Sequence, residues 1–236
     1  MFTIKDFKIE LQNPEEVKEF VKKHGLMAIV CYNTDPKYAE KVGESCLKSG
    51  HLSGSRHLYA WFTLRSVPRS AVDQLVRHYT GFVPQVQSLR YCNKDGKVSI
   101  YIAPELEDNP YMVKTIQDQE DIVNAQYNYI QTFLEDGGIT GEKANEIART
   151  ILPIGVATEC NIAVNLECLM HLANVRLCTR AELPIRTIVK EMVKQVTEVE
   201  PRYKPYLVPN CVKNRRCPEG KHSCGKYNSF VNTVNK

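Results

Sequence analysis

Hydrophobic positions along the chain predict a front half that mixes helices and strands. Asn13 before Pro14 is typical of a helix start, and Gly25 and Gly50 are typical of helix ends. The apolar run at 26–32 is short and continuous, which indicates a buried strand. In order, the pattern predicts a helix over 14–23, a strand over 26–32, a helix over 36–49 and a strand over 58–67.

The middle of the chain carries one strong amphipathic pattern. Asn109 and Pro110 open a long helix that Gly137 and Gly138 close. Its apolar positions at helical spacing are Val113, Ile116, Ile122, Tyr127, Ile130 and Phe133. Before this helix we expect a helix that starts near Pro68 and carries His78, a loop over 80–84 and a short strand over 98–103.

Helices alone are predicted for the back half, over 141–151, 159–177 and 179–199. Thr179 and Glu182 form a capping-box pattern at the start of the last one, and Pro184 predicts a local kink. A mixed front half before a helical back half makes the fold class α+β. We expect one domain over 1–200 and a basic, cysteine-containing tail over 201–236.

Composition narrows the class of protein. With 236 residues, 43% of them hydrophobic and 25% charged, the chain is typical of a globular protein with a real core. The longest apolar run is too short to cross a bilayer and the N-terminus does not resemble a secretory signal, so we expect a cytoplasmic protein without a membrane partner. Nine cysteines then indicate free thiols, most of them small buried side chains, rather than a disulfide scaffold.

The densest cluster of candidate functional residues contains Arg77 and His78, followed ten residues later by Ser88 and then Arg90. Two guanidinium groups and a hydroxyl converging on one place are suited to a phosphate, because Arg is its bidentate partner. The alternative is a solvated helix end with surface arginines. Spacing alone does not decide between them.

Four pieces of sequence, in order, resemble the flavin-dependent thymidylate synthases. The first is Gly50-His-Leu-Ser53 with Val67-Pro-Arg69, and the second is the signature-like Gln74-Leu-Val-Arg-His-Tyr79 with Ser88-Leu-Arg-Tyr91. The third is Ala148-Arg-Thr-Ile-Leu-Pro153, and the fourth is the spacing of Asn165, His171 and Arg176, followed by 181–186. Their order and their spread from about residue 50 to 186 argue against chance agreement.

The resemblance implies an α+β fold with a central antiparallel sheet, and a reductive methylation of dUMP to dTMP. Arg176 would be the catalytic residue, stabilising negative charge on the uracil. The residues implied for dUMP binding are Gln74, Arg77, Gln87, Ser88, Leu89, Arg90, Arg149 and Arg176. Arg149 has a simpler alternative role, an interaction with the carbonyls at the end of its own helix.

Cofactors and assembly are implied in the same way. Methylenetetrahydrofolate would supply the carbon and NADPH the electrons, FAD would carry those electrons, and the sites would lie between subunits of a homotetramer. The implied FAD-lining residues are His51, Ser53, His78, Tyr79, Asn165 and His171. By itself, a histidine such as His171 on an apolar helix face is more often part of the core, and only its spacing to Asn165 and Arg176 favours the cofactor role.

The chain departs from the family pattern at several positions. Tyr79 replaces the second arginine of the signature, Glu167 stands where many members carry a basic residue, and Arg56 replaces an acid. Losing two cations from one site weakens the binding of an anionic ligand there, although Tyr79 can compensate in part by stacking on an aromatic ring. Three explanations stay open: a different mode of FAD binding, a different acceptor or product such as hydroxymethylation, or an inactive paralogue.

Two further hypotheses concern the basic charge and the tail. A net charge of +4 and basic tail residues allow a non-enzymatic nucleic-acid-binding protein, but no basic stripe favours it. We therefore expect no nucleic-acid partner. In the tail, Cys211, Cys217, His222 and Cys224 offer four soft ligands for zinc, but their spacing fits no standard finger, so we expect no metal.

Overall fold

The computed structural model describes residues 1–92 and 97–234, which fold into two compact units. Unit 1 comprises Met1–Lys8, Leu64–Gln74 and Gln85–Cys160, and unit 2 comprises Ile9–Thr63, Leu75–Pro84 and Asn161–Lys236. The strands are β1 (Lys8–Leu11), β2 (Tyr59–Pro68), β3 (Phe82–Val86) and β4 (Ala157–Asn165), in the order β1-β2-β4-β3. The chain thus combines one four-stranded sheet with many helices, so the predicted α+β class is confirmed.

Cross-strand contacts give the direction and register of the sheet. Thr63 faces Asn161 between β2 and β4 through side chains 2.8 Å apart. Between β4 and β3, the backbone of Gln87 donates to Glu159 at one end and that of Asn165 donates to Gly81 at the other. The residue number therefore rises on one strand as it falls on the other, as in antiparallel pairs.

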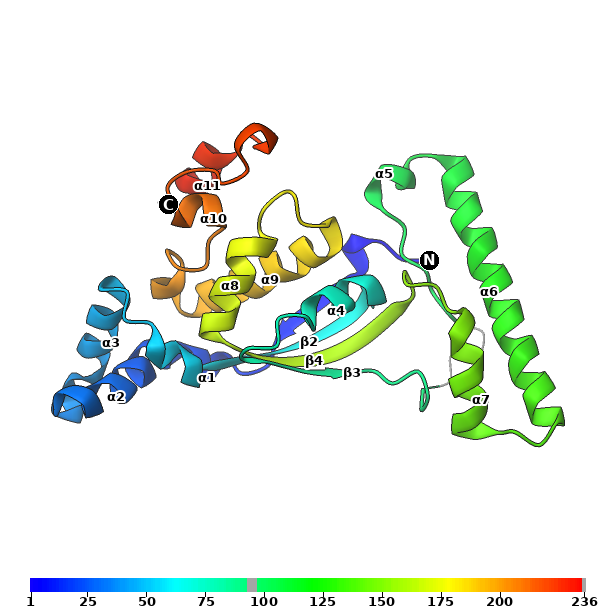
Figure 1. The fold of residues 1–236 in the computed structure, drawn as a ribbon, viewed down its shortest axis with the longest axis horizontal. Helices are drawn as coiled ribbons and strands as arrows, with labels where there is room; N and C mark the ends of the chain where they lie inside the picture. Colours follow the sequence, from blue (N-terminus) through cyan, green and yellow to red (C-terminus); the bar gives the residue numbers. More distant parts are fainter. Residues whose placement is uncertain (93–96, 235–236) are drawn as a thin grey trace. The chain divides into compact units, whose positions relative to one another are not determined.

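Unit 1 contains the long helix of the molecule. Its helices are α4 (Arg69–Leu75), α5 (Pro104–Glu107), α6 (Pro110–Asp136) and α7 (Gly141–Ala148), with the 3-10 helices η1 (Ile4–Asp6) and η4 (Arg149–Ile151). Asn109 caps α6 by accepting from the backbone of Tyr111 and Met112, and α7 lies alongside α6 (Figure 1). Val123 of α6 packs in a small core with Val98, Ile100 and Val156.

Unit 2 holds the larger core. Its α-helices are α1 (Pro14–Lys18), α2 (Phe20–Tyr32), α3 (Ala39–Lys48), α8 (Leu166–Arg176), α9 (Leu183–Val199), α10 (Asn210–Lys213) and α11 (Tyr227–Val234). Its 3-10 helices are η2 (Pro36–Tyr38), η3 (Ser53–His57), η5 (Pro201–Tyr203) and η6 (Gly220–His222). The amphipathic helix α9 buries Ile185, Ile188, Val189, Met192 and Val196, and α8 is packed against it.

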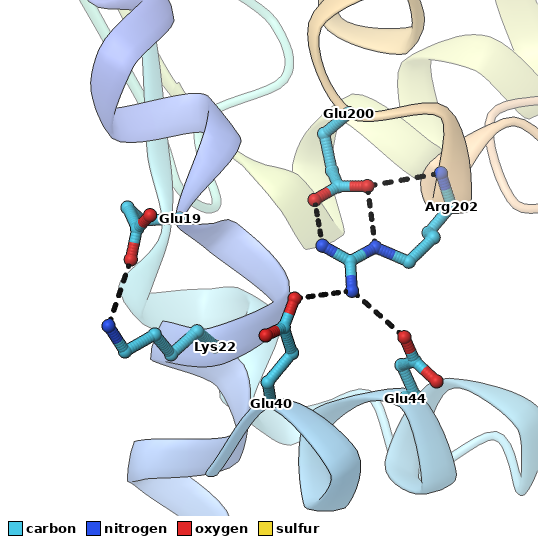
Figure 2. Close-up of polar contacts among 6 residues, drawn as sticks. All are labelled: Glu19, Lys22, Glu40, Glu44, Glu200 and Arg202. Carbon is cyan, nitrogen blue, oxygen red and sulfur yellow. Dashed lines mark hydrogen bonds and ion pairs between the residues drawn. The ribbon is translucent and has the colours of Figure 1, made fainter.

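The segment after α9 is attached to α3 by one arginine. The guanidinium of Arg202 donates to both carboxylate oxygens of Glu200, at 2.8 and 2.7 Å, and to Glu40 and Glu44 of α3, each at 2.9 Å (Figure 2). Glu200 is 3% exposed, whereas Glu40 and Glu44 lie at the surface. Figure 2 also shows the surface pair of Glu19 and Lys22, at 3.3 Å.

Several sequence-based predictions of elements are wrong. The predicted strand over 26–32 is the second half of α2, and the predicted helix over 159–177 begins as strand β4. The predicted loop over 80–84 already enters β3, and the predicted strand over 98–103 forms only isolated bridges at Ile100 and Tyr101. His78 lies beyond the end of α4 rather than on it.

The start of the last long helix also differs from the prediction. Thr179 and Glu182 form no capping box, because α9 begins at Leu183 and the Glu182 side chain makes no capping hydrogen bond. Pro184 falls in the first turn of α9, where its missing N–H is not needed, so it causes no kink. Along α6, Tyr127 is buried as expected, but Ile122 and Phe133 are exposed. In the described residues, none of the helices is both long and apolar enough to span a membrane.

Candidate functional site

A hollow of about 350 Å³ opens in unit 2 where the loop after α4 meets the start of α8. Its lining combines one guanidinium, two imidazoles, a phenol, a hydroxyl, a carboxylate and a thiol: Arg77, His78, Tyr79, Thr80, Glu167, Cys168 and His171. Four of these seven residues, Arg77, His78, Tyr79 and His171, are predicted site residues. The structure therefore groups one part of the predicted set around a single concave surface.

His78 holds Arg176 next to this hollow. The Nε and Nη2 groups of Arg176 donate to Nε2 of His78 at 3.2 and 3.1 Å. Because a guanidinium can only donate, Nε2 must be the unprotonated nitrogen of the ring, and Nδ1 carries the hydrogen. Burial, with the charge of Arg176 and then His171 as smaller causes, lowers the pKa of His78 to about 4. His78 is thus a neutral acceptor at pH 7 that fixes a cation.

The ring of His171 lies 5.3 Å from the ring of His78, tilted by 57°. His171 is exposed on α8, so it is not a core histidine. Cys168 also lines the hollow, and burial raises the pKa of its thiol to about 11, with Glu167 as a second cause. The thiol therefore stays protonated at neutral pH and is a poor nucleophile there.

Asn165 connects the segments around the hollow. Its side-chain carbonyl accepts from the backbone of Cys168 at 2.9 Å and caps α8, while its side-chain amide donates to the backbone carbonyl of Arg56 at 3.2 Å. A Cβ at Gly81 would collide with this side chain, and Gly81 has φ of +76°. Asn165 is buried, so both ends of its amide are used within the protein.

Arg56 and Glu167 form an ion pair at the edge of the hollow. Nε and Nη2 of Arg56 donate to the two carboxylate oxygens of Glu167, at 2.8 and 3.1 Å. The hydrogen bonds that Arg56 donates to Glu167, and then the charge of Glu167, raise the pKa of Arg56. The resemblance implies opposite charges at both positions, which lie 111 residues apart in sequence. Their pairing is a feature of the site that could not be predicted from the sequence.

A second hollow in unit 2, of about 250 Å³, contains the other two predicted cofactor residues. His51 and Ser53 line it together with His24, Met27, Ala28, Cys31, Cys46, Gly54 and His57. The backbone carbonyl of His51 lies 2.9 Å from Nε2 of His24, which is buried. The 3-10 helix η3 runs from Ser53 to His57, so it carries both Ser53 and Arg56.

The predicted phosphate-binding residues Ser88, Arg90 and Arg149 lie in unit 1. Arg90 pairs with Glu142 and, at 3.2 Å, with Glu146, and its backbone carbonyl accepts from Asn145 at 2.9 Å. Lys143, followed by Arg90 and Arg149, lowers the pKa of Glu146, so both arginines act on the same carboxylate. The N–H of Arg90 donates to the hydroxyl of Ser88 at 3.3 Å. Arg149 lies in η4.

The predicted dUMP-binding set is thus divided between the two units. Gln74, Gln87 and Leu89 belong to unit 1 with Arg90, whereas Arg77 and Arg176 belong to unit 2. Gln87 accepts through its backbone carbonyl from Arg69 at 3.3 Å, and Leu89 lies in a turn. Within unit 2, the charge of Arg77 contributes to lowering the pKa of Arg176, so these two residues lie near each other.

The tail cysteines line a third hollow, of about 140 Å³, in unit 2. Cys211, Cys217, His222 and Cys224 all contribute to its wall, and Cys178, which was not part of the predicted zinc set, joins them. Among the described residues, however, no group of three His, Cys, Asp or Glu side chains is arranged to hold a metal ion. The nine cysteines are free, but only Cys46, Cys160 and Cys168 are buried.

Comparisons with known proteins identify the family and the fold. Residues 15–202 match the family model described as "Thymidylate synthase complementing protein". A flavin-dependent thymidylate synthase of Nitratidesulfovibrio vulgaris is 35% identical over 186 residues, which cover 78% of this chain and 74% of the relative. A flavin-dependent thymidylate synthase of Clostridium tetani is 36% identical over 186 residues, which cover 75% of this chain and 73% of the relative. The solved structure of a UMP/dUMP methylase, PolB of Streptomyces cacaoi, superposes with a TM-score of 0.62 at 19% identity, over 86% of this chain and 96% of PolB, and shows a shared fold.

Proposed function

Because this chain belongs to the thymidylate synthase complementing protein family, whose relatives are flavin-dependent thymidylate synthases, we propose that it methylates dUMP to dTMP. The carbon would come from methylenetetrahydrofolate and the electrons from NADPH, with FAD as the flavin. The observation that carries this proposal is the pairing of Arg176 with a neutral His78 beside a hollow lined by Arg77 and His171.

Arg176 has the chemistry that the pyrimidine ring needs. A neutral uracil is a weak carbon nucleophile, and a fixed cation near its carbonyl favours the electron-rich form of the ring. Nε and Nη2 of Arg176 are hydrogen-bonded to His78. The two N–H groups on Nη1 point away from these hydrogen bonds. We propose that these donors contact the uracil and hold its developing negative charge.

The hollow in unit 2 suits a flavin. Tyr79 is exposed and offers an aromatic face, His78 and His171 offer imidazoles, and Arg77 offers a cation for a phosphate. We propose that His78, Tyr79 and His171 hold FAD, with Asn165 positioning them and with contributions from His51 and Ser53, and that Arg77 binds dUMP. When bound, the flavin supplies the redox chemistry of the reduction, and the protein supplies orientation and electrostatics.

The phosphate of dUMP would be bound by Ser88, Arg90 and Arg149 of unit 1, completed by Gln74, Gln87 and Leu89. In the structure, Glu142 and Glu146 neutralise Arg90. A phosphate would replace these carboxylates at the guanidinium, because both are anionic bidentate acceptors. We further propose that the complete site uses residues from more than one subunit of a homotetramer, and that residues 1–200 form the catalytic domain with 201–236 as its tail.

Release of hydrogen from C5 of the uracil tests the function directly. Protein loaded with FAD should release tritium from dUMP labelled at C5, and form dTMP, only when NADPH and methylenetetrahydrofolate are both present. The variant Arg176→Gln should lose at least about a hundredfold in rate, because it removes the fixed charge that stabilises the transition state. The variant Arg180→Gln, which removes a surface cation paired with Glu219, is the matched control. FAD-loaded protein that releases no tritium would contradict the proposal.

A further inference from the structure

Glu167 poses an electrostatic problem for the hollow in unit 2. Its carboxylate lines a surface that, by the proposed function, receives a ligand with anionic phosphate groups. His78 offers no compensating charge, since its lowered pKa leaves it neutral at pH 7. An isolated carboxylate at this place would repel the ligand.

Arg56 solves this problem by pairing with Glu167. The contact joins Nε and Nη2 of Arg56 to both carboxylate oxygens, at 2.8 and 3.1 Å, in a side-on bidentate geometry. It occupies two of the five N–H groups of Arg56. The opposite edge, Nη1, has no partner among the described residues. The pair therefore presents a cation whose orientation is set by Glu167.

The backbone of Arg56 is fixed as well. Arg56 lies in η3, and its carbonyl accepts from the buried amide of Asn165, the residue that also caps α8. The side chain of Arg56 is thus held by Glu167 and its main chain by Asn165. Glu167 lies in the first turn of α8 and Asn165 is the N-cap of the same helix. Such double anchoring is typical of a guanidinium that binds a ligand in a defined place.

We propose that Arg56 recognises the phosphate groups of the flavin nucleotide and that Glu167 is the positioning residue that orients it. The inference rests on the proposed flavin function and adds two residues to the site. It also accounts for the binding of an anionic ligand although Glu167 stands where the resemblance implies a basic residue, because Arg56, the partner of Glu167, supplies the cation.

The test compares FAD with riboflavin, which carries the same ring system but no phosphate. Binding of each flavin is followed by fluorescence quenching in wild-type protein and in Arg56→Gln, Glu167→Gln and Arg180→Gln. We expect Arg56→Gln to weaken FAD binding about tenfold and to leave riboflavin binding unchanged. Glu167→Gln should weaken FAD by a smaller factor, since the cation remains but loses its orientation. Arg180→Gln, the exposed control pair with Glu219, should change neither.

A charge-swapped variant separates recognition from folding. Arg56→Glu alone should lose FAD preferentially, because two carboxylates then face each other. The double variant Arg56→Glu with Glu167→Arg should regain most of the lost affinity, since the pair and its cation are restored. Equal losses for FAD and riboflavin, or no loss in Arg56→Gln, would overturn the inference while leaving the proposed function intact. Wild-type protein that binds neither flavin would overturn both.

Discussion

At the scale of single residues, the pair of His78 and Arg176 determines the charge distribution of the candidate site. His78 accepts two hydrogen bonds on one nitrogen and therefore has to remain neutral. Arg176 keeps its charge although burial, together with the nearby Arg77, lowers its pKa. The result is a cation next to an acceptor that is neutral at pH 7, an arrangement suited to stabilising negative charge.

The protonation of His78 can be measured by NMR. We expect its imidazole to titrate near pH 4, well below the ordinary value. In Arg176→Gln the pKa of His78 should rise, because the repulsion from Arg176 is removed, but burial should still keep it below 6.5. An unchanged pKa in this variant would show that Arg176 does not face the ring. Arg180→Gln should leave the titration as it is in the wild type.

The same group makes stability depend on pH. The unfolded chain binds a proton at His78 below about pH 6.5, whereas the folded chain binds it only near pH 4. The free energy of unfolding should therefore fall between pH 6.5 and 4 through this group, and its contribution should be fully present above pH 6.5. His78→Gln, which keeps an amide acceptor and cannot titrate in this range, should show a flatter dependence in urea unfolding. An equally steep fall would contradict this origin.

The sequence indicates the residue types of the site better than their partners. Arg77, His78, Tyr79 and His171 line one hollow, whereas the ligand that each of them binds stays a prediction. The pairing of Arg56 with Glu167 was out of reach, because ion pairs leave no periodic signal and these two residues are far apart in sequence. The direct cofactor role predicted for Asn165 is a proposal that must be reconciled with an amide already bonded at both ends.

At the scale of elements, α2 and α3 cross at two glycines. A Cβ on Gly25 would collide with the backbone carbonyl of Ala39, and one on Gly43 would collide with that of Val21. The two helices thus touch backbone to backbone. This explains why Gly25 does not end the first helix as the sequence predicts: it is needed for close packing in the middle of α2.

Alanine at either glycine should be strongly destabilising. Gly25→Ala or Gly43→Ala should lower the free energy of unfolding by about 3 kcal/mol, since the helices must move apart. Gly137→Ala is the matched control, because its added Cβ would meet only ordinary contacts at 3.4 Å or more. Chemical denaturation measures the free energy of unfolding of all three variants. A loss below about 1 kcal/mol in both Gly25→Ala and Gly43→Ala would show that the two helices do not touch backbone to backbone.

The arginine that attaches the segment after α9 to α3 allows a second prediction for an element. Arg202→Met leaves the buried carboxylate of Glu200 without its guanidinium and should cost about 3 kcal/mol. Glu44→Gln removes only a surface partner and should cost less than about 1 kcal/mol. The comparison of these two variants in urea unfolding separates the buried pair from the exposed one. Equal effects would contradict that distinction.

The long helix α6, with strong signals at both ends, was predicted well, whereas segments whose apolar pattern fits more than one element were not. Asn109, Pro110 and the two glycines at 137–138 define α6 from local chemistry alone. The apolar run in α2 is compatible with a strand or a buried helix, and tertiary packing against α3 decides between them. In β4, Thr158, Cys160, Ile162 and Val164 alternate with more exposed positions, a period-two signal that the helical prediction overlooked.

At the scale of the whole molecule, α6 exposes large apolar side chains that a monomer would not be expected to leave in water. Tyr129 is 74% and Phe133 67% exposed, and Tyr129 lines an apolar depression with Ala125, Gln126, Ile130 and Ile151. Exposed apolar surfaces are common at protein–protein interfaces. It supports the proposed homotetramer, which the sequence could indicate only through resemblance.

Charged substitutions on α6 test the assembly. We expect wild-type protein to sediment as a tetramer, and Tyr129→Glu with Phe133→Glu to shift it to smaller species while circular dichroism stays unchanged. Activity with dUMP should fall together with the tetramer if the sites use more than one subunit. Thr132→Glu, at an exposed position next to Phe133 on the same helix, adds a charge without removing an aromatic ring and is the control. A wild-type monomer that is fully active would contradict the assembly.

The pairing of Arg56 with Glu167 also has a consequence for the history of the sequence. The resemblance implies an acid at position 56 and a basic residue at position 167, whereas in this chain the two positions carry the opposite charges and bind each other. A change at one position alone would place like charges side by side, which is unfavourable. We therefore expect family members to fall into two groups, acid–base and base–acid, at these two positions, with few chains between them. On this expectation, the two departures that look like losses in the sequence would be one coordinated exchange.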